Sequence, residues 1–161
     1  MENPILKRYA VRKYQPTAVA VADVDQLVAA FEAAPCGMHQ VADMEGAVIT
    51  DPKLRDAVED ASNNACYGAP LLFAIATKKD SQFGERDASA AAENVMVQAA
   101  ALGLGSVYVM SGALAVNGHP DLLKQIGVDD GYQLTVIVAV GKAAEESPAP
   151  DRSNRYKVVR N

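Results

Sequence analysis

One stretch, residues 70–77 (PLLFAIAT), constrains the fold more than any other part of the chain. It is apolar at nearly every position, and turn-forming or charged residues flank it on both sides. An apolar run of this length, without alternating polar positions, is typical of a strand that is covered on both faces. We therefore expect residues 70–77 to form a central strand of a sheet.

Further strands and helices alternate along the chain. Apolar and β-branched runs predict strands at 46–50, 106–110 and 132–140, and helical spacing of apolar side chains predicts helices at 23–34, 52–60, 85–102 and 120–126. Asp51 is expected to cap the second helix, with Pro52 at its first position. No repeat, low-complexity tract or interior linker interrupts the pattern, so we predict one domain over residues 1–161.

The direction of the strands is left open by this pattern. Alternation of strands and helices favours a doubly wound parallel sheet. Four strands and as many helices also fit an α+β sandwich of mixed strand direction, because hydrophobic periodicity does not report how strands pair.

Composition places the chain among globular proteins. It has 161 residues, of which 50% are hydrophobic and 22% charged. Its apolar runs, such as residues 134–140, have the length of a strand and not of a membrane-spanning helix. The opening MENPILKRY lacks the apolar region of a secretion signal. A cytoplasmic protein without membrane association is therefore expected.

Basic residues gather at both ends of the chain. Eight of the 15 lysines and arginines lie in the first 13 and last ten positions, and the stretch between carries 19 acidic and seven basic residues. The acidic middle argues against a nucleic-acid-binding surface. If the ends meet in the fold, their cations form one pocket for an anion. If they do not meet, they are two solvated tails.

Several common motifs are absent from the sequence. The glycines at 103–105 follow a helix and lack the third glycine of a dinucleotide fingerprint, and residues 141–142 do not complete a phosphate loop. No GxSxG elbow is present. Glu59 and Asp60 are expected on a solvated helix face, which argues against a general-acid role for either.

The cysteines offer no metal site and no disulfide framework. Cys36 and Cys66 form no CxxC pair, and only His39 and His119 are available to complete a ligand set. Cys66 is best interpreted as a small buried hydrophobic residue.

Five blocks, read in order, resemble the nitroreductase family along nearly the whole chain. They are KRYAVRKYQP at 7–16, APCGMHQ at 34–40, GAPLLFAIA at 68–76, DASAAAENVMVQAAALGLGSVYVMSG at 87–112 and YQLTVIVAVGKAAEESPAPDR at 132–152. The first is similar to the family's opening basic element, with Arg8 and Arg12 in its basic positions and Ala10 in place of serine. The second is similar to the AP-S-x-x-N-x-Q-P-W loop, but Cys36 replaces serine, His39 replaces asparagine and the closing Pro-Trp is absent.

The resemblance implies an α+β sandwich, with a mixed, mainly antiparallel sheet flanked by helices, that binds FMN between two subunits. Arg8 and Arg152 would hold the 5′-phosphate, because a guanidinium pairs two phosphate oxygens at once and stays charged. Arg12 would lie near the N1–C2 edge of the flavin, where a cation stabilises the reduced cofactor. Asn63 or Asn64 would reach the pyrimidine edge.

Two further segments complete the implied site. Pro35, Cys36 and Gly37 of the neighbouring subunit would cover the ring, and Met110 and Ser111 would offer backbone groups to the N5 side. With their neighbours in the matched motifs, the implied cofactor-binding residues are Arg8, Tyr9, Ala10, Arg12, Pro35, Cys36, Gly37, Met38, Met110, Ser111, Gly112 and Arg152.

Such a protein would pass hydride from NADH or NADPH to FMN and then reduce a nitroaromatic, quinone or similar acceptor. FMN supplies the reactivity, which accounts for the absence of a catalytic triad. A homodimer is expected also because the Ala-rich helix at 85–102 offers an apolar, closely packable face. Two alternatives remain: a non-catalytic flavin-binding or storage protein of the same fold, and a small-anion or nucleotide-binding module without flavin.

Overall fold

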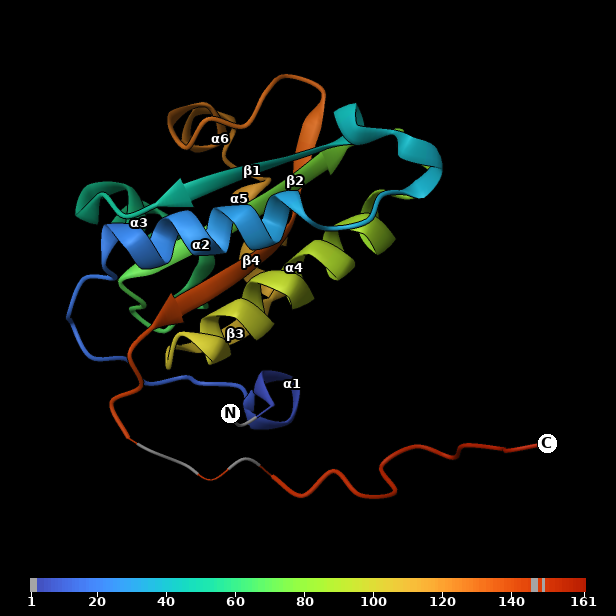
Figure 1. The fold of residues 1–161 in the computed structure, drawn as a ribbon. Coiled ribbons are helices and arrows are strands. Elements are labelled where there is room, and N and C mark those ends of the chain that lie inside the picture. Colours follow the sequence, from blue (N-terminus) through green and yellow to red (C-terminus); the bar gives the residue numbers. More distant parts are fainter. Residues whose placement is uncertain (1–2, 146–147, 149) are drawn as a thin grey trace.

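The computed structural model describes residues 3–145, 148 and 150–161, and within them four strands form a sheet in the order β1-β2-β4-β3 (Figure 1). The strands are β1 (Met44–Ile49), β2 (Leu71–Lys78), β3 (Gly105–Val109) and β4 (Tyr132–Gly141). Neighbouring strands all run antiparallel, which excludes the doubly wound parallel sheet and confirms the α+β sandwich. β2 lies inside the sheet between β1 and β4, as its continuous apolar sequence predicts.

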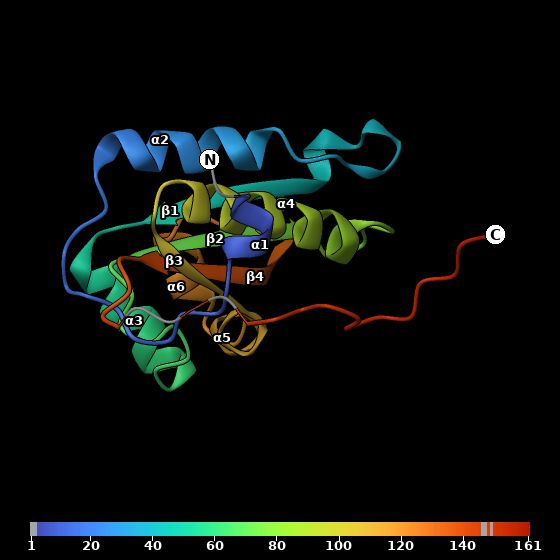
Figure 2. The same cartoon turned by 60° about the horizontal axis from the view of Figure 1, so that its bottom comes forward.

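Helices cover both faces of the sheet (Figure 2). One face packs against α2 (Val21–Glu32) and α4 (Gly84–Ala101), which we call the α2/α4 layer, and the other packs against α3 (Pro52–Ser62), α5 (Met110–Val116) and α6 (Pro120–Gln125), which we call the α3/α5 layer. Within β2, residues 71, 73 and 75 pack in the α2/α4 layer and residues 72, 74 and 76 in the α3/α5 layer. Successive strand side chains point to opposite faces, so a wholly apolar strand serves both cores.

Three short elements complete the described chain: α1 (Pro4–Lys7), η1 (Gly37–His39) and η2 (Val41–Asp43). The first lies beside α4, and the other two connect α2 to β1 (Figure 1). The last block of the family resemblance, residues 132–152, includes positions 146, 147 and 149, which lie outside the described residues.

Local capping chemistry places α3 where the sequence predicts it. The Asp51 carboxylate accepts a hydrogen bond from the Leu54 amide at 3.0 Å, and Pro52 occupies the first turn, where its missing N–H has no intrahelical partner to lose. The helix extends to Ser62 and closes on Asn63 in the left-handed conformation.

The predicted strand at 106–110 needs a correction at its end. β3 stops at Val109, and Met110 begins α5 instead of closing the strand. Gly112, Ala113 and Val116 are the buried residues of this helix. Their spacing is helical, and it places one face of a seven-residue helix on the core.

The Ala-rich face of α4 is used within one chain. Ala88, Ala91, Ala92, Val95 and Ala99 are all fully buried, in contact with α2 and the sheet. Small side chains let α2 and α4 approach each other closely. This face is therefore not free for a second copy, and the prediction that it forms a subunit contact is wrong.

Within the described residues no helix has both the length and the apolarity that crossing a bilayer requires. The same residues contain no group of three His, Cys, Asp or Glu side chains placed to hold a metal ion.

Candidate functional site

An N-terminal arm, residues 8–15, runs beside the start of β3 and the end of β4. The Val11 amide donates to the Ser106 carbonyl oxygen at 3.0 Å, and the Gln15 amide donates to the Lys142 carbonyl oxygen at 2.8 Å. These bonds hold the arm extended against the sheet.

Tyr14 anchors the same arm in the interior. Its hydroxyl oxygen lies 2.8 Å from the Val11 carbonyl oxygen and 3.1 Å from the Ala139 carbonyl oxygen. Burial raises the pKa of this phenol well above its usual value. A Cβ at Gly141 would lie 2.5 Å from the Pro70 ring and 3.1 Å from the Tyr14 ring, so glycine lets the arm approach.

The extended form of the arm sorts its side chains to two sides. Val11 is buried against Gly105, whereas Ala10 and Arg12 are exposed. Because alternate residues of an extended segment share a side, Ala10 and Arg12 lie together on the open side, whereas the Arg8 side chain is only 25% exposed. These are the positions that the family resemblance assigns to the cofactor.

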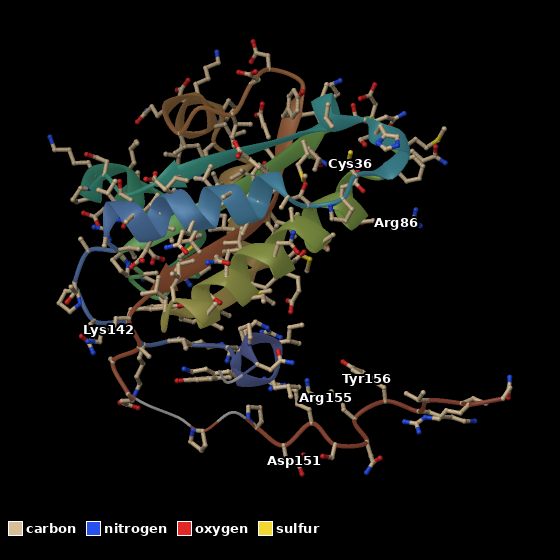
Figure 3. The ribbon with its side chains drawn as sticks, in the orientation of Figure 1. Cys36, Arg86, Lys142, Asp151, Arg155 and Tyr156 are labelled. Carbon is tan, nitrogen blue, oxygen red and sulfur yellow. The ribbon has the colours of Figure 1, made fainter. Side chains whose placement is uncertain are left out.

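The two basic ends of the chain do meet. Arg152 donates from Nη1 to the Leu6 carbonyl oxygen at 2.9 Å and from Nη2 to the Arg8 carbonyl oxygen. The interpretation of two separate solvated tails is therefore wrong for Arg152. After Arg152 the C-terminal segment extends away from the sheet and helices, and the side chains of Arg155 and Tyr156 project from it (Figure 3).

A cavity of about 460 Å³ opens where the ends meet. Lys7, Arg8 and Lys142 supply three cations to its wall, and Tyr9 and Ser106 also line it. The Ser106 hydroxyl is buried and has no hydrogen-bond partner among the described residues. One carboxylate competes for this charge, because Glu93 Oε1 lies 3.3 Å from Nε of Arg8.

Arg12 lies beside an aromatic ring that sequence reasoning missed. Its Cζ is 6.0 Å from the centroid of the Tyr67 ring, within the range of a cation–π contact. Tyr67 belongs to the turn of residues 63–68 between α3 and β2, in which Asn63, Asn64, Tyr67 and Gly68 all have positive φ. Both candidate asparagines are exposed on this turn.

Glu59 requires the clearest correction. It was expected on a solvated helix face, but the residue is 9% exposed. Its Oε2 accepts from the Cys66 amide at 3.0 Å and its Oε1 from the Gly68 amide at 2.6 Å. Burial first, and then the negative charge of Glu59, raise the pKa of the Cys66 thiol to about 12. Cys66 is fully buried, as predicted.

The segment Met110–Gly112 lies on the α3/α5 side of the sheet. Met110 and Ser111 are exposed at the start of α5, and Gly112 is buried. A Cβ at Gly112 would lie 3.0 Å from Val109 and 3.5 Å from Sγ of Cys66. Gly112 is therefore packed next to the turn that carries Tyr67.

The loop of Pro35 to Met38 belongs to the other side. The Gly37 amide donates to both carboxylate oxygens of Asp87 at 3.0 and 3.1 Å, and a Cβ at Gly37 would lie 2.4 Å from the Phe83 ring. Phe83 immediately precedes α4, and Asp87 lies in its first turn. Figure 3 shows Cys36 at this end of α4, far from Lys142 at the opposite end of the molecule.

One chain therefore brings together only part of the predicted set. Arg8, Tyr9, Ala10 and Arg152 meet at the arm, and Arg12 and Gly112 lie on either side of the turn at 63–68. Residues 35–38 lie in the α2/α4 layer, with the sheet between them and the α3/α5 layer (Figure 2).

Sequence signals existed for some of the missed residues. The NNACYG stretch after α3 is rich in residues that adopt positive φ, and amides in such a turn need acceptors. Glu59 lies one helical turn before Asn63, so its carboxylate is close enough in sequence to accept hydrogen bonds from the amides of this turn. Glu93 had no comparable signal, because its contact with Arg8 depends on how α1 lies beside α4.

Fold and site together define an α+β sandwich protein with a basic cavity where its two chain ends meet beside the sheet. A model of the nitroreductase family matches residues 37–142. The chain therefore belongs to the nitroreductase family.

Solved structures of similar architecture cover almost the whole chain. An FMN-bound nitroreductase from Bacteroides fragilis is 20% identical, with a TM-score of 0.82 and 95% of each chain covered. One from Desulfitobacterium hafniense with bound FMN is 18% identical, with a TM-score of 0.85 and 99% of this chain and 100% of that chain covered. An FMN-dependent nitroreductase from Clostridium difficile is 26% identical, with a TM-score of 0.80 and 100% and 99% covered. No curated protein matches the sequence.

Proposed function

We propose that the protein is a cytoplasmic FMN-dependent NAD(P)H oxidoreductase, a homodimer of single-domain chains, that reduces nitroaromatic, quinone or similar acceptors. The observation that carries this proposal is the meeting of the two basic ends. Arg152 contacts the backbone of Arg8, and Arg8 lines a cavity together with Lys7 and Lys142.

The residues present fit the phosphate end of FMN. Guanidinium and ammonium groups around one cavity supply the charge that a phosphate dianion needs. The buried Ser106 hydroxyl offers a further donor that nothing else in the described residues uses. A small neutral ligand would not compensate so much positive charge.

The ring end of the site rests on Arg12 and on the start of α5. When bound, FMN would accept a hydride from NADH or NADPH and pass it to the acceptor. Arg12 would favour the reduced cofactor through its charge, and Met110 and Ser111 would present main-chain groups to the N5 side. Ala10 offers no hydroxyl where serine is usual in the family, so we expect FMN to be held less tightly.

A second copy would complete the site. Residues 35–38 lie in the α2/α4 layer, so a single chain does not supply both this loop and Arg12 to one flavin. Large apolar side chains are exposed on α1, β3 and α5, and a second copy would cover them; they are Ile5, Leu6, Tyr108, Met110 and Leu114. Exposed apolar patches of this kind are common at subunit interfaces.

FMN titration of the purified protein tests the phosphate end. Replacing Arg8 or Arg152 by Ala should weaken FMN binding by about 2 kcal/mol, because each removes a charge-assisted contact. Lys124→Ala removes one exposed charge from α6 and should leave the affinity unchanged. Unchanged affinity in both arginine variants would overturn the assignment. Light scattering of the FMN-loaded protein at micromolar concentration tests the dimer, which a monomeric mass would contradict.

One observation favours a second candidate, a non-catalytic flavin-binding or storage protein. Ala10 and Cys36 stand where the family resemblance places hydroxyl groups, so the pocket has fewer polar contacts than usual. Steady-state NAD(P)H oxidation with a quinone or nitro compound separates the two candidates. Turnover supports the oxidoreductase, and bound FMN without turnover supports storage.

A further inference from the structure

Glu59 is a buried carboxylate for which the proposed flavin site has no direct use. It lies near the end of α3 and is 9% exposed. Burying a charged side chain is costly unless hydrogen bonds compensate it. The hydrogen-bond partners of the Glu59 carboxylate therefore indicate its role.

Those partners are two main-chain amides that flank one residue. Oε2 accepts from the Cys66 amide at 3.0 Å and Oε1 accepts from the Gly68 amide at 2.6 Å. The carboxylate therefore holds the backbone of the turn on both sides of Tyr67. Hydrogen bonds to a carboxylate are stronger than those between neutral groups.

The backbone conformation of Tyr67 requires such hydrogen bonds to hold it. Its φ is +61°, in the left-handed region that bulky side chains rarely occupy. A strained residue keeps this conformation only when its surroundings hold it there. Two bonds from one buried carboxylate provide that constraint.

The held residue contacts the cation of the proposed ring site. Tyr67 is 40% exposed, and the centroid of its ring lies 6.0 Å from Cζ of Arg12. Arg12 is otherwise a long, exposed side chain on the open side of the arm. The aromatic face restricts where its guanidinium lies.

We propose that Glu59 is a positioning residue, whose carboxylate holds the turn at 63–68 so that Tyr67 fixes the guanidinium of Arg12 at the flavin edge. This inference rests on the proposed function, because it needs Arg12 to face the flavin. Glu59 acts through Tyr67 and touches no reacting atom.

Glu59→Gln is the first test, because glutamine keeps the shape but has one acceptor oxygen and places an NH₂ against the second amide. Hydrogen exchange at Cys66 and Gly68 should accelerate by about tenfold or more, and exchange within β2 should not change. The preference of the protein for reduced over oxidised FMN should fall about tenfold, which lowers the two-electron midpoint potential by about 30 mV. Asp60→Asn removes the same charge from the exposed neighbour and should alter neither readout.

Tyr67 supplies a second set of variants. Tyr67→Leu should lower the midpoint potential as Glu59→Gln does, but it should not accelerate hydrogen exchange at Gly68. Tyr67→Phe, which retains a ring, should keep the parent potential. Combining Glu59→Gln with Tyr67→Leu should shift the potential no further than either alone, because both act through one contact. If Glu59→Gln does not fold, an unmoved potential in Tyr67→Leu overturns the proposal by itself.

The outcomes separate this inference from the proposed function. A parent protein that binds no FMN overturns the proposed function. A parent that binds FMN, with faster exchange but an unchanged potential in Glu59→Gln, limits Glu59 to a structural role and overturns only the inference. Equal shifts in Asp60→Asn and Glu59→Gln would overturn it as well, because a general charge effect would then explain both.

Discussion

The side chain of Asn117 pairs with the main chain of Leu134 as a neighbouring strand would. Nδ2 donates to the Leu134 carbonyl oxygen at 2.8 Å, and Oδ1 accepts from the Leu134 amide at 2.8 Å. β3 pairs with β4 only from Ile137 onward, so Leu134 lies beyond the end of β3. One amide group therefore satisfies both polar groups of a buried residue.

Asn117→Ala should lower the free energy of unfolding by about 2 kcal/mol, because it leaves a buried N–H and C=O without partners. Urea denaturation measures the change. Asn161→Ala, at an exposed position of the C-terminal segment, serves as the residue-matched control and should lie within about 0.5 kcal/mol of the parent. Equal stabilities for the two variants would contradict the pairing.

Glu93→Gln should tighten FMN binding. The Glu93 carboxylate lies 3.3 Å from Nε of Arg8 and competes with a phosphate for its charge. Half-exposed ion pairs contribute about 0.2–1 kcal/mol, so the affinity should rise by about 1.4- to fivefold. Fluorescence titration provides the measurement, with Glu85→Gln on the exposed face of α4 as the control. Weaker binding in Glu93→Gln would show that Glu93 helps to orient Arg8 for the phosphate.

Cys66 should make the protein less stable at alkaline pH. Its pKa in the folded state is raised from its ordinary value to about 12, first by burial and then by Glu59. Above the ordinary value the unfolded thiol ionises while the folded one does not, so stability is intact below pH 9 and is lost as pH rises toward 12.

Urea denaturation at increasing pH tests this dependence. Cys66→Ala should remove a slope of up to about 1.4 kcal/mol per pH unit above the ordinary thiol value. Tyr14 adds its own loss at still higher pH, because its pKa is also raised, first by burial and then by Cys66. Cys36→Ala should keep the parent slope. The same slope in all three proteins would rule out Cys66 as the source.

Cys36→Ser should retain FMN binding and keep quinone reduction within a few-fold of the parent. Cys36 is half-buried and precedes Gly37, whose amide donates a hydrogen bond to the Asp87 carboxylate. A serine hydroxyl fits the same space as the thiol. Reduction and reoxidation of bound flavin, measured separately in single-turnover experiments, check this expectation. A variant with full flavin content but almost no turnover would instead assign Cys36 a redox role.

Local chemistry made several elements predictable. The apolar run of β2 required a covered strand, and Asp51 with Pro52 marked the start of α3. The helix at 110–116 was missed because its short apolar sequence continues directly from that of β3, without a break that periodicity would register.

By itself, the sequence determined the covered central strand, the caps and spacing of the main helices, and the charge at both ends of the chain, because each depends on neighbours within a few residues. Only the tertiary structure decided that the strands run antiparallel and that Arg152 reaches the backbone of Arg8. These contacts join residues far apart in the chain or depend on how layers pack, and neither periodicity nor residue type encodes such distances.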